Sequence, residues 1–217
     1  MKVAAIKRKE LVIEGFKKYL PEAFVLYVVE IFLSANVKFK IVNGRKTKLG
    51  DFRAGINGEK HQISVNGDMN SYSFLITTLH EFAHLQTFNT YQNRVAPHGE
   101  EWKNAYRKLL VPVVNSEHLP EDIRKALVNS LINTKASSCT DHQLSRVLNS
   151  YNKPIEGVEI LERLPKNSTF VLNGREFIKG PLRRKRFICE DVKTKKSYLV
   201  NALANVYPKE LIENEEK

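Results

Sequence analysis

Residues 71–88 predict a helix that is apolar on nearly every side. Such a helix is usually central to a fold, because none of its faces can be left in water. His80 and His84 lie on it four residues apart, so both side chains project from one face and can reach one metal ion. Glu81 is rotated by about 100° from His80 and lies beside the two histidines. The sequence therefore predicts a core helix with a metal site on one face.

The pattern His80-Glu81-x-x-His84 also indicates a chemistry. Two neutral imidazoles and an open coordination position favour one Zn²⁺ ion. Zinc lowers the pKa of a bound water toward about 7, and Glu81 is placed to accept that proton as general base. We predict His80 and His84 as zinc ligands and Glu81 as the catalytic residue. The alternative is a chance pair of histidines on a buried helix.

A third protein ligand is needed beside two histidines and a water. His98 is the best candidate, because it lies in a loop just before the next predicted helix. Glu100 and Glu101 remain alternatives, since a carboxylate completes some zinc sites. Acidic residues in a first helical turn also stabilise the helix dipole, which explains them without a metal.

The His-Glu-x-x-His motif of residues 80–84, followed by His-Gly-x-x-Trp at residues 98–102, resembles the SprT-like metalloprotease family, which includes the eukaryotic Spartan protease. The basic segment of residues 45–50 is also similar to that family, and the resemblance covers roughly residues 6–110. It implies a DNA-linked role, since Spartan degrades proteins crosslinked to DNA. It implies a zincin-like fold with one zinc ion bound by His80, His84 and His98, and with Glu81 as general base.

The C-terminal part departs from this family. Many SprT-like proteins continue with a zinc ribbon built on two Cys-x-x-Cys pairs, but this chain has only Cys139 and Cys189. Cys139 and His142 have ligand-like spacing without a second half. We expect no second metal and interpret the unit as a metal-free ribbon or an SH3-like barrel.

A change in residue pattern divides the chain near Lys135. The first part combines helices with strand candidates at 37–42 and 61–66, and Asn43-Gly44 predicts a hairpin turn. From about residue 158 the period is two, which predicts an antiparallel β unit with a tight turn at Asn173-Gly174. The expected fold class is α+β. It comprises an SprT-like domain at 1–135, followed at 136–217 by a linker, a short helix and a basic β domain.

The net charge of +11 favours a polyanionic partner. Residues 166–209 hold eleven Lys or Arg and three acids. DNA, preferably single-stranded, is the expected partner, because basic hairpins beside an aromatic residue can follow a phosphate backbone; a solvated face is the alternative. The candidate contacts are Arg183, Arg184, Lys185 and Arg186, with Lys193, Lys195 and Lys196 on a turn expected nearby. A second basic cluster comprises Lys38, Lys40, Arg45, Lys46 and Lys48.

No membrane partner is expected. The longest apolar run, residues 24–33, is interrupted by Glu30 and is about half the length of a membrane span. Two cysteines cannot form a disulfide framework, which suits a reducing compartment. We expect a cytoplasmic protein, associated with the nucleoid in a bacterium.

These features favour a zinc-dependent endopeptidase that cuts proteins bound or crosslinked to DNA. An extended substrate would pair with a strand edge near Ile63. The main alternative is a nucleic-acid-binding protein with a structural or vestigial zinc site and no proteolytic activity. A peptidase without a DNA partner is the third possibility.

Overall fold

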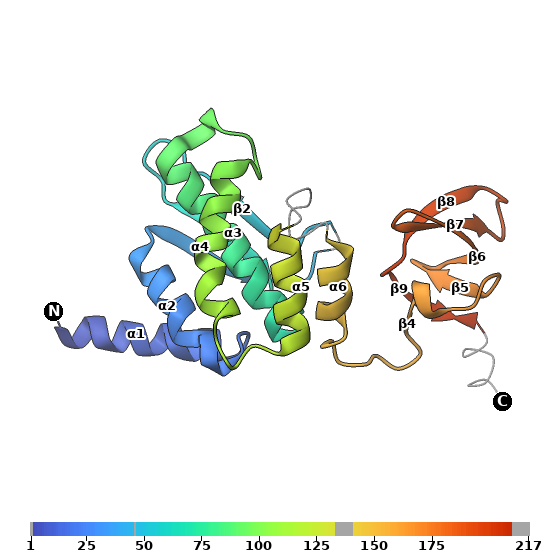
Figure 1. Cartoon of the computed structure of the whole chain (residues 1–217), viewed down its shortest axis with the longest axis horizontal. Coiled ribbons are helices and arrows are strands. Elements are labelled where there is room, and N and C mark those ends of the chain that lie inside the picture. The colour runs from blue at the N-terminus through green and yellow to red at the C-terminus, as the bar shows by residue number, and fades with distance from the viewer. Residues whose placement is uncertain (1, 46, 133–140, 210–217) are drawn as a thin grey trace. The chain divides into compact units, whose positions relative to one another are not determined.

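The computed structural model describes residues 2–45, 47–132 and 141–209, with the side chains of 2–5 left aside. It has the expected α+β architecture, with six α-helices, a three-stranded sheet and a six-stranded sheet in this part of the chain (Figure 1). The chain forms two compact units, Met1–Asn152 and Lys153–Lys217. None of the described helices is long and apolar enough to cross a membrane.

The first unit extends further along the chain than the change in residue pattern predicts. Lys135, where we expected the boundary, lies outside the described residues. Helix α6 (His142–Asn149) belongs to the first unit, because its buried residues Leu144 and Leu148 join that unit's apolar core. The two units therefore separate after Asn152.

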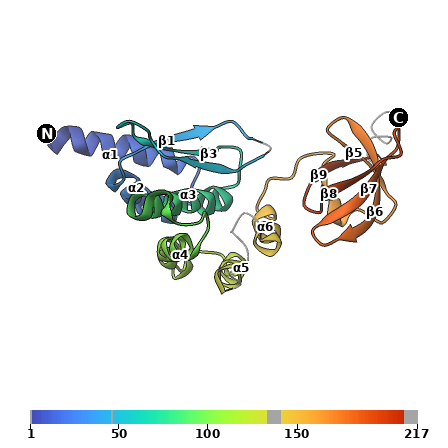
Figure 2. The ribbon, with the colours of Figure 1, turned by 90° about the horizontal axis from the view of Figure 1, so that it is seen from above.

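Helix α3 (Ser71–Tyr91) is the centre of the first unit. Twelve of its 21 residues are buried, as its apolar sequence predicts. In Figure 2 the three-stranded sheet lies on one side of α3, and helices α4 and α5 lie on the other. The remaining helices of the described part are α1 (Lys2–Lys17), α2 (Val25–Ser34), α4 (Glu100–Val114) and α5 (Glu121–Ile132).

The sheet of the first unit has the order β1-β3-β2. Strand β3 (His61–Asn66) pairs in parallel with β1 (Val37–Val42) and antiparallel with β2 (Gly50–Arg53). The predicted hairpin at Asn43-Gly44 is therefore wrong. Arg45 holds the chain after β1 against β3 instead, donating hydrogen bonds to Asn66 Oδ1 at 2.8 Å and Ser64 Oγ at 3.1 Å.

This strand order also corrects the expected substrate edge. Ile63 lies in the central strand β3, has a strand on each side and is fully buried. A peptide cannot pair there, because the backbone groups of β3 are already used within the sheet. The edge strand that packs on α3 is β2.

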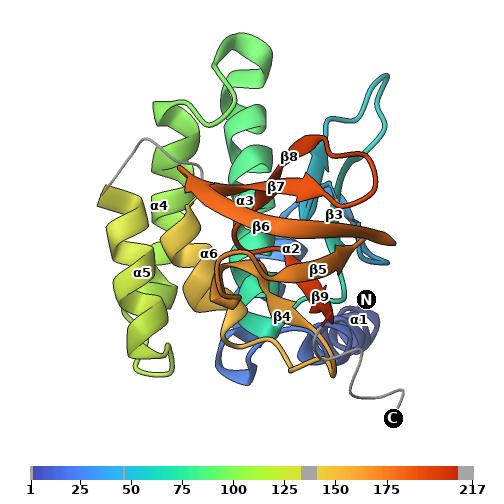
Figure 3. The same ribbon diagram turned by 90° about the vertical axis from the view of Figure 1, so that its right-hand side faces the viewer.

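The second unit is an antiparallel sheet with the order β4-β9-β5-β6-β7-β8, seen in Figure 3. The predicted Asn173-Gly174 turn is confirmed: it joins β5 to β6, and both residues have a positive φ, 51° and 73°. Strand β9 (Asn205–Pro208) was not predicted from the sequence. The strands are β4 (Glu159–Ile160), β5 (Thr169–Leu172), β6 (Arg175–Arg183), β7 (Arg186–Asp191), β8 (Ser197–Asn201) and β9.

Candidate metal centre and active site

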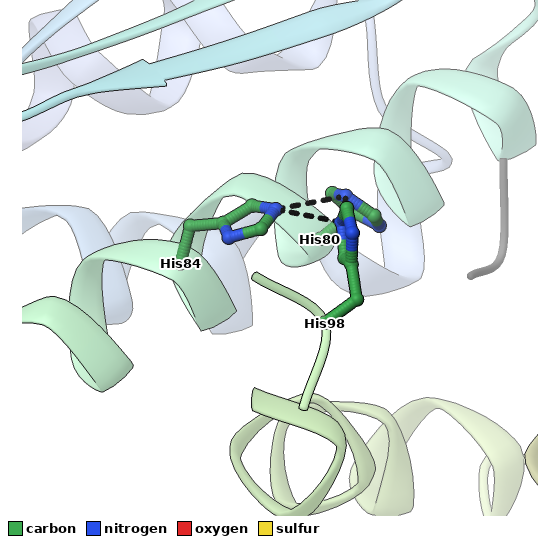
Figure 4. A group of neighbouring side chains, drawn as sticks. All are labelled: His80, His84 and His98. Carbon is green, nitrogen blue, oxygen red and sulfur yellow. Dashed lines mark hydrogen bonds between the residues drawn. The ribbon is translucent and has the colours of Figure 1, made fainter. Parts of the chain in front are cut away.

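Three histidines converge on one point of the first unit (Figure 4). His80 and His84 project from α3, and His98 comes from the loop before α4. The His84 Nε2 atom lies 3.1 Å from that of His80 and 3.0 Å from that of His98, and the remaining pair is 3.1 Å apart. His98 reaches this position with a positive φ of 60°.

These three contacts cannot all be hydrogen bonds. An imidazole nitrogen that carries a proton donates and has no lone pair left to accept, whereas an unprotonated one only accepts. Among three such atoms at least two have the same role, so at least one pair repels. A cation at the centre removes the conflict, because all three nitrogens can then direct lone pairs at it. A tetrahedral zinc site with bonds of about 2.0–2.1 Å would separate its nitrogens by about 3.3 Å, so the triad fits such an ion.

Burial keeps the triad in the neutral form that binds metal. It lowers the pKa of His80 to about 2 and that of His84 to about 4, and the neighbouring imidazoles add to both effects. Burial also lowers the pKa of His98. At neutral pH the three rings therefore offer lone pairs and carry no positive charge.

The carboxylates proposed as alternative ligands lie outside the triad. Within the described residues, the group of side chains able to share one metal contains the three histidines alone. Glu100 points to solvent and forms a salt bridge with Lys103 at 2.8 Å. His98 is thus the geometrically suited third residue, and its role as a zinc ligand stays a prediction.

Glu81 is a buried carboxylate beside the triad, only 5% exposed. Burial raises its pKa to about 8, and the nearby charge of Asp51 adds to this, whereas Arg45, Lys48 and a hydrogen bond from the Phe52 backbone N–H lower it. The side chain therefore rests against the edge strand β2.

Gly50 makes this approach possible. A Cβ atom on Gly50 would lie 2.4 Å from Glu81 Oε1, which is far inside van der Waals contact. Sequence reasoning noted Gly50 as part of a family resemblance but missed its relation to Glu81. Only the contact between β2 and α3 reveals it.

Two aromatic groups flank the triad. On one side the Trp102 ring centroid lies 4.6 Å from those of His80 and His98 and 5.3 Å from that of His84. Trp102 is buried in the core and contacts every ring of the triad. On the other side Phe52 lies parallel to His84, with a centroid distance of 6.5 Å.

The basic residues of the second unit form two separate groups. Arg183–Arg186 make the tip of the β6–β7 hairpin, and Lys193, Lys195 and Lys196 lie on the turn from β7 to β8. All seven residues are exposed. The expectation that the turn lies near the tip is wrong, because they are at opposite ends of β7, about 20 Å apart for a strand of this length.

The second basic cluster is only partly engaged in the fold. Arg45 is bonded to β3, and Lys48 forms a salt bridge with Asp51 at 2.8 Å. Lys38 and Lys40 are exposed on β1, and Lys46 lies outside the described residues. Of the two cysteines, Cys189 is a buried free thiol, and Cys139 lies outside the described residues.

Comparison with known proteins agrees with the motifs. Residues 21–122 match the model of the SprT-like family. The matched segment includes all three histidines, Glu81 and Gly50, and it indicates a metalloprotease-like domain. No curated protein and no solved structure matches the chain.

Proposed function

Since residues 21–122 form an SprT-like segment, we propose that the first unit is a zinc-dependent endopeptidase and that the chain acts on proteins bound or crosslinked to DNA. One observation carries the peptidase proposal. Three neutral imidazole nitrogens lie 3.0–3.1 Å from one another beside the buried carboxylate of Glu81.

Each of these residues has a role in this proposal. Zinc held by His80, His84 and His98 would polarise the scissile carbonyl and lower the pKa of a water. Glu81 takes the proton of the attacking water and later delivers it to the leaving amine. Burial raises the pKa of Glu81 to about 8, and the positive charge of a bound zinc ion would lower it again and favour the carboxylate that this step needs. The hydrogen bond from the Phe52 N–H orients the Glu81 carboxylate for this transfer.

The composition of the triad favours a catalytic over a structural zinc site. Structural sites close the fourth coordination position with a protein ligand, whereas catalytic sites keep it for water or substrate. In the described part of the chain no fourth side chain joins the three histidines. A substrate would approach along β2, since an extended peptide can add to an edge strand.

The DNA partner is supported by charge. The hairpin tip Arg183–Arg186 carries four consecutive basic residues, all exposed. Elsewhere in the unit Arg175 pairs with Asp191, and Lys209 pairs with Glu176. We assign the tip as the main phosphate contact, with single-stranded DNA as the favoured ligand. A cytoplasmic site of action belongs to the proposal and rests on the low cysteine count.

The first experiment incubates the purified full chain with a histone, with and without single-stranded DNA, for the wild type and for Glu81→Gln. We expect cleavage by the wild type alone, stimulated by DNA. Glu81→Gln should bind zinc normally and lose at least about a hundredfold in rate, as is usual for a general base. Absence of cleavage in every arm, with zinc and DNA both bound, would favour the binding protein without proteolytic activity.

The DNA surface is tested by paired charge reversals. Arg183→Glu with Arg186→Glu should weaken binding to single-stranded DNA and lower the salt dependence, because fewer phosphates are neutralised. Lys193→Glu with Lys196→Glu is the matched control at the other end of β7 and should have the smaller effect. Equal effects of both pairs would remove the assignment to the tip. Cleavage indifferent to DNA would indicate a peptidase without a DNA partner.

A further inference from the structure

The two aromatic groups that flank the triad differ in exposure. On the α4 side Trp102 and Tyr106 are each 3% exposed and belong to the core. On the opposite side Phe52, His61 and Phe88 are only partly buried. We call these last three residues the open aromatic group.

The open aromatic group is a contiguous surface. The centroid of Phe52 lies 5.8 Å from that of His61 and 5.7 Å from that of Phe88, and the remaining pair is 5.2 Å apart. The three rings come from three different elements, β2, β3 and α3. Tertiary packing therefore brings partly exposed apolar surface together immediately beside His84, which the Phe52 ring faces at an interplanar angle of 9°.

This surface also lies beside the proposed general base. Phe52 is part of the edge strand β2, and its backbone N–H donates to the Glu81 carboxylate. Side chains of an extended peptide point alternately to its two sides. A peptide along β2 with its scissile bond near Glu81 would place a neighbouring side chain over Phe52 and Phe88.

The loop after β2 extends the same surface. The Gly55 N–H donates to His61 Nδ1 at 2.9 Å, which ties this loop to the open aromatic group. The next residue, Ile56, is 73% exposed. An exposed isoleucine next to a fixed loop position adds apolar area that the fold itself does not bury.

We propose that the open aromatic group is a substrate subsite that receives an apolar or aromatic side chain next to the scissile bond. The inference rests on the proposed peptidase function. The group contains no carboxylate, lysine or arginine, so a charged side chain would be desolvated there without a partner. Leu, Met, Phe and Tyr fit this chemistry.

The test maps cleavage sites on an unfolded protein such as casein by mass spectrometry, using the zinc-loaded full chain with single-stranded DNA present. The wild type should favour apolar residues at one position flanking the cut, by roughly tenfold or more over glycine, the range found for apolar pockets. Phe88→Glu should remove this preference and shift it toward Lys and Arg. Tyr91→Glu is the matched control, since Tyr91 is an exposed residue at the end of the same helix.

A second variant covers the case in which Phe88→Glu is inactive. Phe88→Ala should raise KM for a peptide with leucine at the selected position more than for the same peptide with glycine, while Tyr91→Ala leaves the ratio unchanged. A uniform wild-type profile, or a profile that Phe88 variants do not change, would overturn the subsite and leave the peptidase intact. Failure of the wild type to cut any protein would instead refute the proposed function.

Discussion

At the scale of single residues, the site depends on a glycine, which has no side chain, as much as on the histidines and the glutamate. Glu81 reaches the edge strand because Gly50 has no Cβ, and its carboxylate occupies the space that a methyl group would fill. The motif identifies Glu81 from sequence alone. The requirement for glycine at position 50 follows from a contact between residues 31 positions apart, which no local pattern records.

Gly50→Ala should therefore impair the proposed general base and spare the proposed metal site. The methyl group would displace the Glu81 carboxylate, so we expect kcat to fall by about tenfold or more while zinc affinity is retained, as for a loss of positioned proton transfer. Steady-state kinetics and a chelator competition measure the two quantities.

Gly15→Ala is the matched control for Gly50→Ala. A Cβ on Gly15 would meet nothing within 4 Å, and Gly15 lies in helix α1. This change should leave kcat unaltered and stabilise the helix by up to about 1 kcal/mol. An unchanged kcat in Gly50→Ala would contradict the role assigned to Gly50.

Trp102 contacts the triad without being fixed by a hydrogen bond of its own. Its Nε1 atom is buried and has no acceptor among the described residues, so the indole is held by packing. Trp102→Phe loses contact area with the three imidazoles and sacrifices no hydrogen bond. We expect its zinc dissociation constant to rise by about ten- to a hundredfold, the usual cost of changing a residue that supports metal ligands.

Metal competition with a chromophoric chelator measures this effect. Leu110→Ala is the control, because Leu110 is fully buried on the same helix and has no aromatic ring to stack against the three imidazoles. It should destabilise the fold by about 2–5 kcal/mol and leave zinc affinity nearly unchanged. Equal losses of affinity in both variants would show that Trp102 acts only through stability.

At the scale of elements, local turn chemistry predicted one hairpin correctly and another wrongly. Asn173-Gly174 joins neighbouring antiparallel strands, whereas Asn43-Gly44 follows a strand whose partner is parallel. A favourable turn sequence permits a hairpin, but the choice of partner strand depends on which pairing buries β3 against α3. That choice is not encoded within the turn.

The turn from β7 to β8 makes the second unit sensitive to acid. Asp191 accepts hydrogen bonds from the Thr194 backbone N–H at 2.6 Å, from Thr194 Oγ1 at 2.8 Å and from Arg175 Nε at 2.9 Å. The Thr194 N–H, helped by the Thr194 hydroxyl and by Arg175, lowers the pKa of Asp191 to about 2. Since the folded-state pKa lies below the ordinary value of 3.8, the carboxylate stabilises the fold above that value. This contribution is lost as the pH falls toward about 2.

Asp191→Asn should thus be less stable than the wild type at neutral pH, and the difference should shrink between pH 4 and about pH 2. Cys189 is buried in this unit and provides the readout. In a Cys139→Ser background, its reaction with an acid-active disulfide reagent reports unfolding of the unit in urea. A difference between the two proteins that stays constant with pH would refute the role of the Asp191 carboxylate.

At the scale of the whole molecule, the division into units assigns α6 to the unit that carries the histidine triad. Leu144 and Leu148 are 1% and 9% exposed within the first core. The Asn70 side chain, at the N-terminus of α3, donates to the Leu148 carbonyl at 2.9 Å. Helix α6 therefore supports the helix that carries His80 and His84.

A fragment of residues 1–152 should consequently be more stable than a fragment of residues 1–135. Two buried leucines contribute about 1.5–3 kcal/mol each, so the shorter fragment should lose roughly 3–6 kcal/mol of unfolding free energy. Urea denaturation followed by Trp102 fluorescence measures this. Equal midpoints for the two fragments would contradict the placement of α6 in the first unit.

The features that could be predicted from the residues alone depend on short-range physics. The spacing of His80 and His84, the apolar character of α3 and the period of two in the second unit are properties of neighbouring residues, because helix and strand geometry repeat over a few positions. Tertiary structure alone decided the convergence of His98, the fit of Glu81 against Gly50, the identity of β2 as the edge and the separation of the basic tip from the basic turn. Each of these features depends on how distant segments pack together. The free energy gained by burying apolar surface in this packing is a property of the whole folded molecule, so no short stretch of sequence records it.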